Sequence, residues 1–332
     1  MVDDSLRIRR TKQGKGFSYF YVSGRKLANQ RALKRINKLA IPPNWQDVRI
    51  AHEATADLQA TGYDIKGRKQ YIYHQNWQKT RQEEKFNKLI QFADVLPDFR
   101  KACWSLVDVP GWKKEKSLAL VCLMLDHTGL RAGNKYYTQQ NQTFGLTTLR
   151  RQHLDKEGQS VSFSFTGKHG KDRHVNISDP RLAELVCDSA QAQGYAIFRY
   201  KDTDGRWQDV DSGDVNQFIH SHAGEEFTCK DFRTWGASRY GVASLPDIEQ
   251  VYLGNKRRRW DTTFVKHIAS MLGNTPAICR QYYIHPKLIS TFEDEKQRQE
   301  ALIELDGLKS KNSAAHASLN QLERYLTQII SG

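Results

Sequence analysis

The chain has 332 residues, 39% of them hydrophobic and 27% charged, and a net charge of +14. No apolar run approaches the ~18 residues that a membrane span needs, and the N-terminus lacks the apolar stretch of a secretory signal, so neither a membrane protein nor a secreted protein is expected. The cysteines are odd in number and form no CxxC pair, which indicates free thiols in a reducing, cytoplasmic compartment rather than disulfides or a zinc site; they are Cys103, Cys122, Cys187, Cys229 and Cys279.

The first part of the chain predicts short strands. Alternating or β-branched runs bounded by turn residues occupy residues 7–10, 17–22, 47–52 and 68–74, and they surround one amphipathic helix over 30–40. The proline pair in AIPPNW marks a loop. This strand-rich segment reads as a small lobe.

From about residue 82 the apolar residues recur at helical spacing. Helices are predicted over 82–96, 98–109, 114–130, 179–190, 212–222, 228–241 and 313–330. Between them, strands are predicted over 146–154, 160–167 and 173–178, joined by DKEG and KHGK turns. The pattern predicts an α+β fold: a small β-rich N-terminal lobe, residues 1–81, and a larger, mainly helical lobe, residues 82–332, with a three-stranded antiparallel sheet and a helical tail.

Charge is distributed unevenly between these lobes. Residues 1–100 carry 20 basic and 10 acidic side chains, whereas the remaining 232 carry 31 and 27. The asymmetry favours a polyanionic partner for the front of the protein. Charge alone also permits a basic protein without such a partner.

Several common cofactor motifs are missing from the sequence. It contains no P-loop, no GxGxxG that opens a helix after a strand, and no HExxH. His220 and His222 lack a third ligand nearby and read as a polar helix end. Asp202 and Asp204 begin like a calcium loop, but the later ligand spacing fails, so a hairpin turn is predicted. We therefore expect chemistry without a nucleotide cofactor or a metal.

Three cationic residues occupy unusual positions in the larger lobe. Arg131 lies in a Gly-Leu-Arg-Ala-Gly corner just past an apolar helix, and Lys168 lies at a strand end that enters a tight turn. Arg233 lies among aromatic and small residues on a helix, where a partly buried guanidinium needs an anionic partner. Each has a structural alternative, respectively a helix-end cap, a solvated turn residue and half of an internal ion pair. Further along, MLGNTPAICRQYYIHP holds two adjacent phenols.

Together these stretches resemble one family. The motifs TGLRAGN, FGLTTLRRQHL, TGKHGK, KDFRTWGAS and LGNTPAICRQYYIHP, with IPPNW and LQATGYDIKGRKQYIYH in the front lobe, are similar to those of the type IB DNA topoisomerases in their small poxvirus and bacterial form. The resemblance implies a tyrosine recombinase/topoisomerase IB-like fold and a monomer that clamps double-stranded DNA at the bacterial nucleoid. It implies ATP-independent relaxation of supercoils by single-strand cleavage through a 3′-phosphotyrosyl intermediate, strand rotation and religation.

The resemblance also implies roles for individual residues. Tyr283 is the expected nucleophile, Arg131 and Arg233 stabilise the charge on the phosphate, and Lys168 is the general acid, with Lys171 as the competing candidate. Asn274 stands nine residues before Tyr283, where poxvirus and nuclear relatives have a histidine, and its amide can still donate a hydrogen bond. Tyr282 is expected to point about 100° away on a helix and to pack or to contact the DNA backbone.

Residues for DNA binding are expected in both lobes. Tyr71 and Tyr73 lie on the same face of one strand, Gln70 beside them can read base edges, and the neighbouring Lys66, Arg68 and Lys69 suit phosphates. Lys135 and Tyr136 are expected to reach the major groove. Lys256–Arg259 fit a phosphate grip or a solvated helix face equally well.

Two other functions compete with this interpretation. Tyrosine site-specific recombinases share the Arg, Lys, Arg and Tyr set, but they typically carry His-x-x-Arg where this chain has Lys230-Asp231-Phe232-Arg233, and their front domain is usually helical. A DNA-architectural protein explains the charge but not the reactive set.

Overall fold

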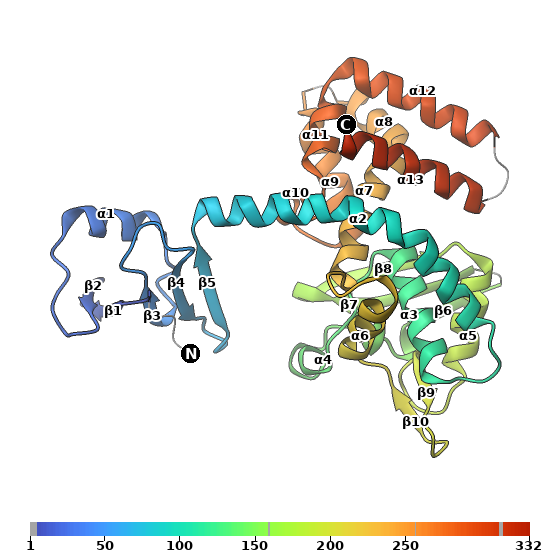
Figure 1. Ribbon diagram of the computed structural model, residues 1–332, viewed down its shortest axis with the longest axis horizontal. Coiled ribbons are helices and arrows are strands. Elements are labelled where there is room, and N and C mark those ends of the chain that lie inside the picture. The colour runs from blue at the N-terminus through green and yellow to red at the C-terminus, as the bar shows by residue number, and fades with distance from the viewer. Residues whose placement is uncertain (1–4, 159, 256, 312–314) are drawn as a thin grey trace. The chain divides into compact units, whose positions relative to one another are not determined.

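The computed structural model describes residues 5–158, 160–255, 257–311 and 315–332. It divides into two compact units, Met1–Lys85 and Phe86–Gly332, and the division falls inside helix α2 (Gln75–Val107) (Figure 1). Strands and helices are both abundant, so the predicted α+β class is confirmed. The division into a DNA-binding domain, residues 1–81, and a catalytic domain, residues 82–332, stays a prediction. Within the described residues, no helix is long and apolar enough to cross a membrane.

The N-terminal unit is an antiparallel sheet with strand order β2-β1-β3-β4-β5 and one helix, α1 (Gln30–Lys38). The strands are β1 (Ile8–Gln13), β2 (Gly16–Tyr21), β3 (Gln46–Ile50), β4 (Leu58–Tyr63) and β5 (Lys69–Tyr73). Helix α1 and four of these strands confirm the predictions. Strand β4 was missed because its buried positions hold polar and small residues: Gln59 is buried and is satisfied by Arg35, whose Nη1 lies 2.6 Å from its Oε1.

The C-terminal unit holds the remaining elements. Its helices after α2 are α3 (Lys114–Thr128), α4 (Lys135–Asn141), α5 (Pro180–Ala190), α6 (Ser212–Ala223), α7 (Cys229–Ala243), α8 (Leu245–Leu253), α9 (Trp260–Leu272), α10 (Pro276–Tyr282), α11 (Pro286–Glu293), α12 (Glu295–Lys311) and α13 (Ala315–Ser331). The predicted tail helix corresponds to α13, although residues 313–314 lie outside the described residues.

Helix α2 unites two stretches that were predicted separately. It continues through Pro97, although an interior proline removes one backbone hydrogen bond. The buried side chains Phe92, Leu96, Phe99 and Cys103 lie on both sides of that position at helical spacing. Packing of this continuous apolar stripe offsets the local cost of the proline.

The predicted three-stranded antiparallel sheet is present, but its first strand was placed wrongly. The strands are β6 (Leu154–Glu157), β7 (Ser160–Gly167) and β8 (Lys171–Ile177). Residues 146–153 instead form two short 3₁₀ turns, Leu146–Thr148 and Arg151–His153. Backbone N–H groups of Leu146 and Thr147 donate to the carbonyls of Arg131 and Ala132, at 2.9 and 2.6 Å, so this segment braces the Arg131 corner instead of pairing in the sheet.

The hairpin turn predicted at Asp202 is confirmed. Strands β9 (Arg199–Lys201) and β10 (Trp207–Asp209) pair antiparallel on either side of it. The Asp202 carboxylate accepts from the backbone N–H of Asp204 and of Arg206, at 3.0 and 2.8 Å. Its oxygens therefore stabilise a turn.

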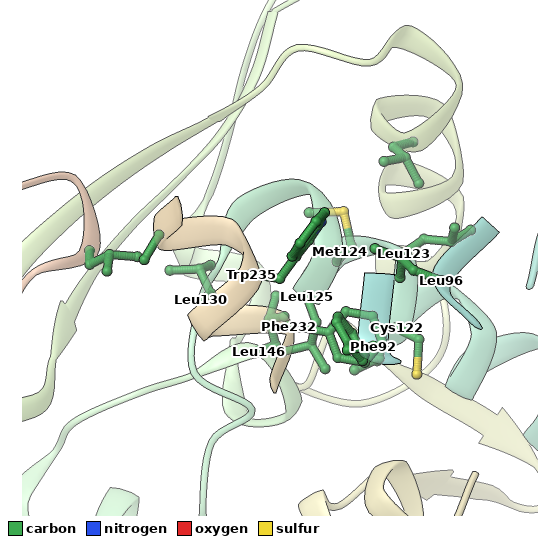
Figure 2. Close-up of a cluster of buried hydrophobic side chains, with 14 of the residues drawn as sticks. Phe92, Leu96, Cys122, Leu123, Met124, Leu125, Leu130, Leu146, Phe232 and Trp235 are labelled. Atoms are coloured by element: carbon green, nitrogen blue, oxygen red, sulfur yellow. The ribbon is translucent and has the colours of Figure 1, made fainter. Parts of the chain in front are cut away.

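Helix α3 forms the centre of the C-terminal unit. Residues Leu118–Leu125 are all buried, and the helix contacts α5, α6, α7, β8 and β9. Figure 2 shows Leu123, Met124 and Leu125 of α3 among the core side chains of α2 and α7, including Phe92, Phe232 and Trp235. A helix that is apolar all round is held on every side, so the segment that leaves its C-terminus starts from a fixed point.

A buried charge network joins four helices around this core. Arg100 on α2 forms ion pairs with Asp126 on α3 and Glu323 on α13, each at 2.6 Å. Arg239 on α7 lies 3.1 and 3.0 Å from the same two carboxylates, and Trp235 donates from its indole N–H to Glu323 at 2.9 Å. Two guanidiniums thus meet two carboxylates, and every charge is paired.

We expect Glu323→Ala to lower the free energy of unfolding by about 3–5 kcal/mol, because removing one partner leaves buried positive charge uncompensated. Chemical denaturation of both proteins at neutral pH measures the change. Glu300→Ala, on the exposed Lys296 pair of α12, is the matched control and should shift stability by less than about 1 kcal/mol. Equal small losses in both variants would contradict the structural importance of the network.

Candidate active site

Arg131 is held at a sharp corner after α3. The helix ends at Gly129, whose φ of 61° is left-handed and favours glycine. Further on, Gly145 approaches the corner so closely that a Cβ there would lie 2.7 Å from the Arg131 carbonyl oxygen. The Arg131 guanidinium donates from Nη2 to Oδ1 of Asn274. The Arg131 side chain therefore bonds to a side chain 143 positions away in the sequence. It does not cap the end of α3, which was the structural alternative.

Arg233 is buried on α7, with 3% of its surface exposed. Its Nη1 donates to the Gly129 carbonyl at 2.5 Å. Its Nη2 donates to the Leu272 carbonyl and to Oδ1 of Asn274, the latter at 3.3 Å. Among the described residues no carboxylate forms an ion pair with Arg233, so its structural alternative, half of an internal ion pair, is not seen there.

Positive charge is crowded at this point. Burial, then the charges of Arg131 and Arg173, lower the pKa of Arg233 to about 10, against an opposing effect of Tyr283. Burial also lowers the pKa of Arg131, and burial together with Arg131 lowers that of Arg173. All three remain cationic at neutral pH. Cations that destabilise one another provide an electrostatic site for an anion.

Two buried donors at the site have no hydrogen-bond partner among the described residues, Nε of Arg233 and Nδ2 of Asn274. An unsatisfied buried donor costs about 1–3 kcal/mol. The Oδ1 of Asn274 already accepts from both arginines, so its amide N–H₂ faces elsewhere. Acceptor oxygens of a bound anion would satisfy both donors.

Tyr283 lies beside Arg233. It is the C-cap residue of α10, and its backbone N–H donates to the Cys279 carbonyl at 2.9 Å. The Arg233 guanidinium carbon lies 5.3 Å from the centre of its ring, and the partly buried ring packs on the core. The neighbouring Tyr282 keeps 38% of its surface exposed. The two adjacent phenols therefore occupy different environments.

The two candidate lysines are placed differently on the β7–β8 hairpin. Lys168 is exposed at its tip, in the 3₁₀ turn Lys168–Gly170. Lys171 begins β8, and its ammonium donates to the backbone carbonyl of Asn274 at 3.0 Å. The structure thus brings Arg131, Arg233, Asn274 and Tyr283 together and places Lys171, rather than Lys168, against them.

Arg173 is a further cation at the site that sequence reasoning missed. On β8 it donates from Nη1 to the Ser270 carbonyl at 3.1 Å and from Nη2 to the Met271 carbonyl. These carbonyls belong to the last turn of α9, just before Asn274. The signal was available, because residues i and i+2 of a strand share a face and Arg173 follows Lys171 by two.

His285 is buried two residues beyond Tyr283, with 7% of its surface exposed. It caps α11 by accepting the Lys287 N–H at Nδ1, at 3.2 Å, and its ring lies edge-on to Phe86 with 4.9 Å between centres. Burial, with a smaller contribution from Lys287, lowers its pKa to about 4. The native state therefore holds it neutral over the whole range in which a free histidine titrates.

From this lowered pKa we expect a pH dependence of stability. Between pH 6.5 and 4, His285 is protonated in the unfolded chain but neutral in the folded chain. The contribution of neutral His285 to the free energy of unfolding is therefore complete above pH 6.5 and is lost as the pH falls towards 4. The loss amounts to about 2–3 kcal/mol. His285→Asn keeps a capping oxygen and should flatten this part of the profile in denaturation measured at several pH values. An unchanged slope would contradict the assignment.

The residues expected to bind DNA are mostly exposed in each unit. Tyr71 stacks on Tyr73 with 6.1 Å between ring centres, which confirms their common face. Lys66 and Lys69 are exposed, whereas Arg68 and Gln70 both donate to Asp64, at 2.8 and 3.0 Å.

In the C-terminal unit Tyr136 is 65% exposed, and Lys135 lies 3.8 Å from Asp209. Lys256 lies outside the described residues. Residues 257–259 lie in the connection between α8 and α9, so the solvated helix face was wrong for them. Arg259 forms an ion pair with Asp261 at 3.2 Å.

Comparison with known proteins identifies relatives along most of the chain. The family model "Eukaryotic DNA topoisomerase I, catalytic core" matches residues 74–307, and "Bacterial DNA topoisomerase IB, N-terminal domain" matches residues 16–64. DNA topoisomerase 1B of Acanthamoeba polyphaga mimivirus is 28% identical over 87% of this chain and 88% of that protein. DNA topoisomerase 1B of Vaccinia virus (strain Copenhagen) is 20% identical over 80% of this chain and 83% of that protein.

A solved structure of XerH site-specific recombinase bound to difH substrate is 14% identical, with a TM-score of 0.37, over 62% of this chain and 51% of that one. That likeness is too low to support a conclusion. The first family model alone covers well over half of the chain, and its match includes Arg131, Arg233 and Tyr283. The chain belongs to the DNA topoisomerase I family and is a type IB enzyme with a bacterial-type N-terminal domain.

Proposed function

We propose that this topoisomerase relaxes supercoiled duplex DNA without ATP, by cutting one strand through a 3′-phosphotyrosyl link, letting the strand rotate and resealing it. The observation that carries the proposal is the convergence of Arg131, Arg233 and Asn274 beside the Tyr283 ring, with no carboxylate paired to either arginine among the described residues. A phosphodiester supplies the anion that such a site lacks.

In the cleavage step, the Tyr283 oxygen forms a bond to phosphorus and the bond from phosphorus to the 5′-oxygen breaks. The phenol proton passes to water, and the Lys168 ammonium gives a proton to the departing 5′-oxygen. Religation reverses each transfer, as the 5′-hydroxyl attacks phosphorus and releases the phenol. One ester replaces another in both directions, so the bond energy is retained and ATP is not needed.

The arginines supply most of the electrostatic stabilisation. The site must remove on the order of 20 kcal/mol of barrier from a very inert diester. Arg131 and Arg233 offer planar donor forks to the nonbridging oxygens, and the unsatisfied Nε of Arg233 and Nδ2 of Asn274 are further donors for them. Backbone carbonyls hold Arg233, and the Asn274 side chain holds Arg131, before DNA arrives, so little reorganisation is required.

Lys168 is proposed as the acid because its tip position leaves the ammonium available to an approaching duplex. Lys171 remains the competing candidate, although its ammonium is engaged with the Asn274 carbonyl. We further propose that the protein acts as a monomer at the bacterial nucleoid. Gln70, Tyr71, Tyr73, Lys66, Arg68 and Lys69 of the N-terminal unit and Lys135 and Tyr136 of α4 would hold the duplex.

Incubation with supercoiled plasmid, without ATP and with a chelator present, tests this function. Relaxed topoisomers, together with a protein–DNA adduct trapped by denaturant, are the expected result. Strand exchange between two specific sites would instead identify a tyrosine recombinase. Binding with an unchanged linking number would identify an architectural role and overturn the proposal.

A further inference from the structure

The β7–β8 hairpin is fastened to the end of α9 by two side chains of one strand. Arg173 donates to the carbonyls of Ser270 and Met271, the former at 3.1 Å, and Lys171 donates to the carbonyl of Asn274 at 3.0 Å. These acceptors lie at the end of α9 and at Asn274, just before helix α10, which leads to Tyr283. The hairpin carrying Lys168 is thus attached to the segment carrying Asn274 and Tyr283.

Two glycines let the Arg173 side chain pass closely between the two segments. A Cβ on Gly167, the residue before Lys168, would lie 3.0 Å from Cγ of Arg173. A Cβ on Gly273, the residue before Asn274, would lie 2.7 Å from Nη1 of Arg173. Arg173 therefore contacts the backbone immediately before the proposed acid and immediately before the phosphate-binding amide.

We propose that Arg173 is a positioning residue that sets the hairpin against the Asn274 segment, so that Lys168 reaches the leaving 5′-oxygen; this rests on the proposed function. Its guanidinium is a rigid fork that holds two consecutive carbonyls. Lysine in its place would keep the charge but offers a single flexible ammonium. The role is separate from phosphate binding, because both Nη atoms of Arg173 are bonded to the backbone of α9.

The chemistry of the leaving group provides the test. An alkoxide needs a proton to depart, whereas a thiolate, whose conjugate acid has a pKa near 8.5, departs without one. Single-turnover cleavage is measured on duplexes with either oxygen or sulfur at the 5′-bridging position. We expect Arg173→Ala to slow oxygen cleavage on the order of 10²-fold, within the range of general-acid effects, and the sulfur substrate to restore most of the rate.

Four companion variants make the result specific. Lys168→Ala should show the same rescue by sulfur, and Arg173→Lys should lie between Arg173→Ala and the wild type. Arg206→Ala removes one exposed arginine at the β9–β10 turn and should cleave both substrates normally. Gly167→Ala keeps every charge but adds the methyl that meets Arg173, so it should give a weaker form of the same pattern if Arg173→Ala fails to fold.

Each remaining outcome decides against a named step. Equal slowing of Arg173→Ala on both substrates, or unimpaired cleavage of the oxygen substrate, would overturn the positioning role. If Lys168→Ala cleaves slowly and the sulfur substrate does not restore its rate, Lys168 is not the general acid, and the positioning role of Arg173 is rejected too. Absence of cleavage by the wild type on both substrates would instead reject the proposed function.

Discussion

Tyr283→Phe is expected to eliminate the covalent protein–DNA adduct and plasmid relaxation, with a loss on the order of 10⁵–10⁶ in rate, as for other nucleophile deletions. The substitution removes the oxygen that would form the ester but keeps the ring that packs on the core beside Arg233. Folding and DNA binding should therefore persist. Adduct formation on end-labelled DNA, resolved in denaturing gels, measures the loss directly.

Tyr282→Phe is the matched control for this experiment. It removes a phenol oxygen from the adjacent residue, whose side chain is 38% exposed, and it should leave both the adduct and the relaxation rate close to wild type. Adduct that survives in Tyr283→Phe and disappears in Tyr282→Phe would identify the wrong choice of nucleophile. Survival in both would exclude the phosphotyrosyl mechanism at this pair.

Arg233→Ala is expected to lower the single-turnover cleavage rate on the order of 10²–10³-fold, the usual effect of removing one donor from a preorganised anion site. The loss should exceed any loss in DNA affinity, because the guanidinium acts on charge that develops during the reaction. Stability should change less, since lost bonds to the Gly129 and Leu272 carbonyls are offset by relief of repulsion from Arg131 and Arg173.

Arg239→Ala provides the contrast on the same helix. Arg239 is as deeply buried as Arg233, but it is paired with Asp126 and Glu323, so its removal should cost about 3–5 kcal/mol of stability. Thermal denaturation and cleavage rates measured on both variants separate the two roles. Cleavage by Arg233→Ala within tenfold of wild type would contradict its proposed part in the reaction.

Local patterns predicted much of the fold. Alternation gave β1, β2, β3 and β5, and helical spacing gave α3, α5, α6 and α7. Strand β4 escaped because its buried Gln59 is satisfied by side-chain hydrogen bonds, which no periodicity reveals. Residues 146–153 look β-like in composition, but the N–H groups of Leu146 and Thr147 donate to the Arg131 corner and the residues that follow form 3₁₀ turns, so the strand begins only at Leu154.

The candidate site residues that lie in motifs could be named from the sequence. The contacts that side chains make with backbone atoms could not. Arg131, Arg233, Asn274 and Tyr283 were named from their motifs, and the structure brings them together. The contacts of Arg173 and Lys171 go to main-chain carbonyls about 100 positions away, and a carbonyl leaves no trace in residue identity. For the same reason the sequence could not show that Lys171 is engaged while Lys168 is exposed.

Glu323 follows the other residues of the buried charge network in the sequence, so it is the one that is synthesised after them. Helices α2, α3 and α7 are translated before α13, so until Glu323 is added Arg100 and Arg239 share the single carboxylate of Asp126 and their buried charge is only partly compensated. A nascent or prematurely terminated chain would therefore hold Arg131, Arg233, Asn274 and Tyr283, the proposed catalytic residues, while the charge network of their scaffold is still incomplete. We therefore expect a chain without α13 to have a less stable scaffold around these residues.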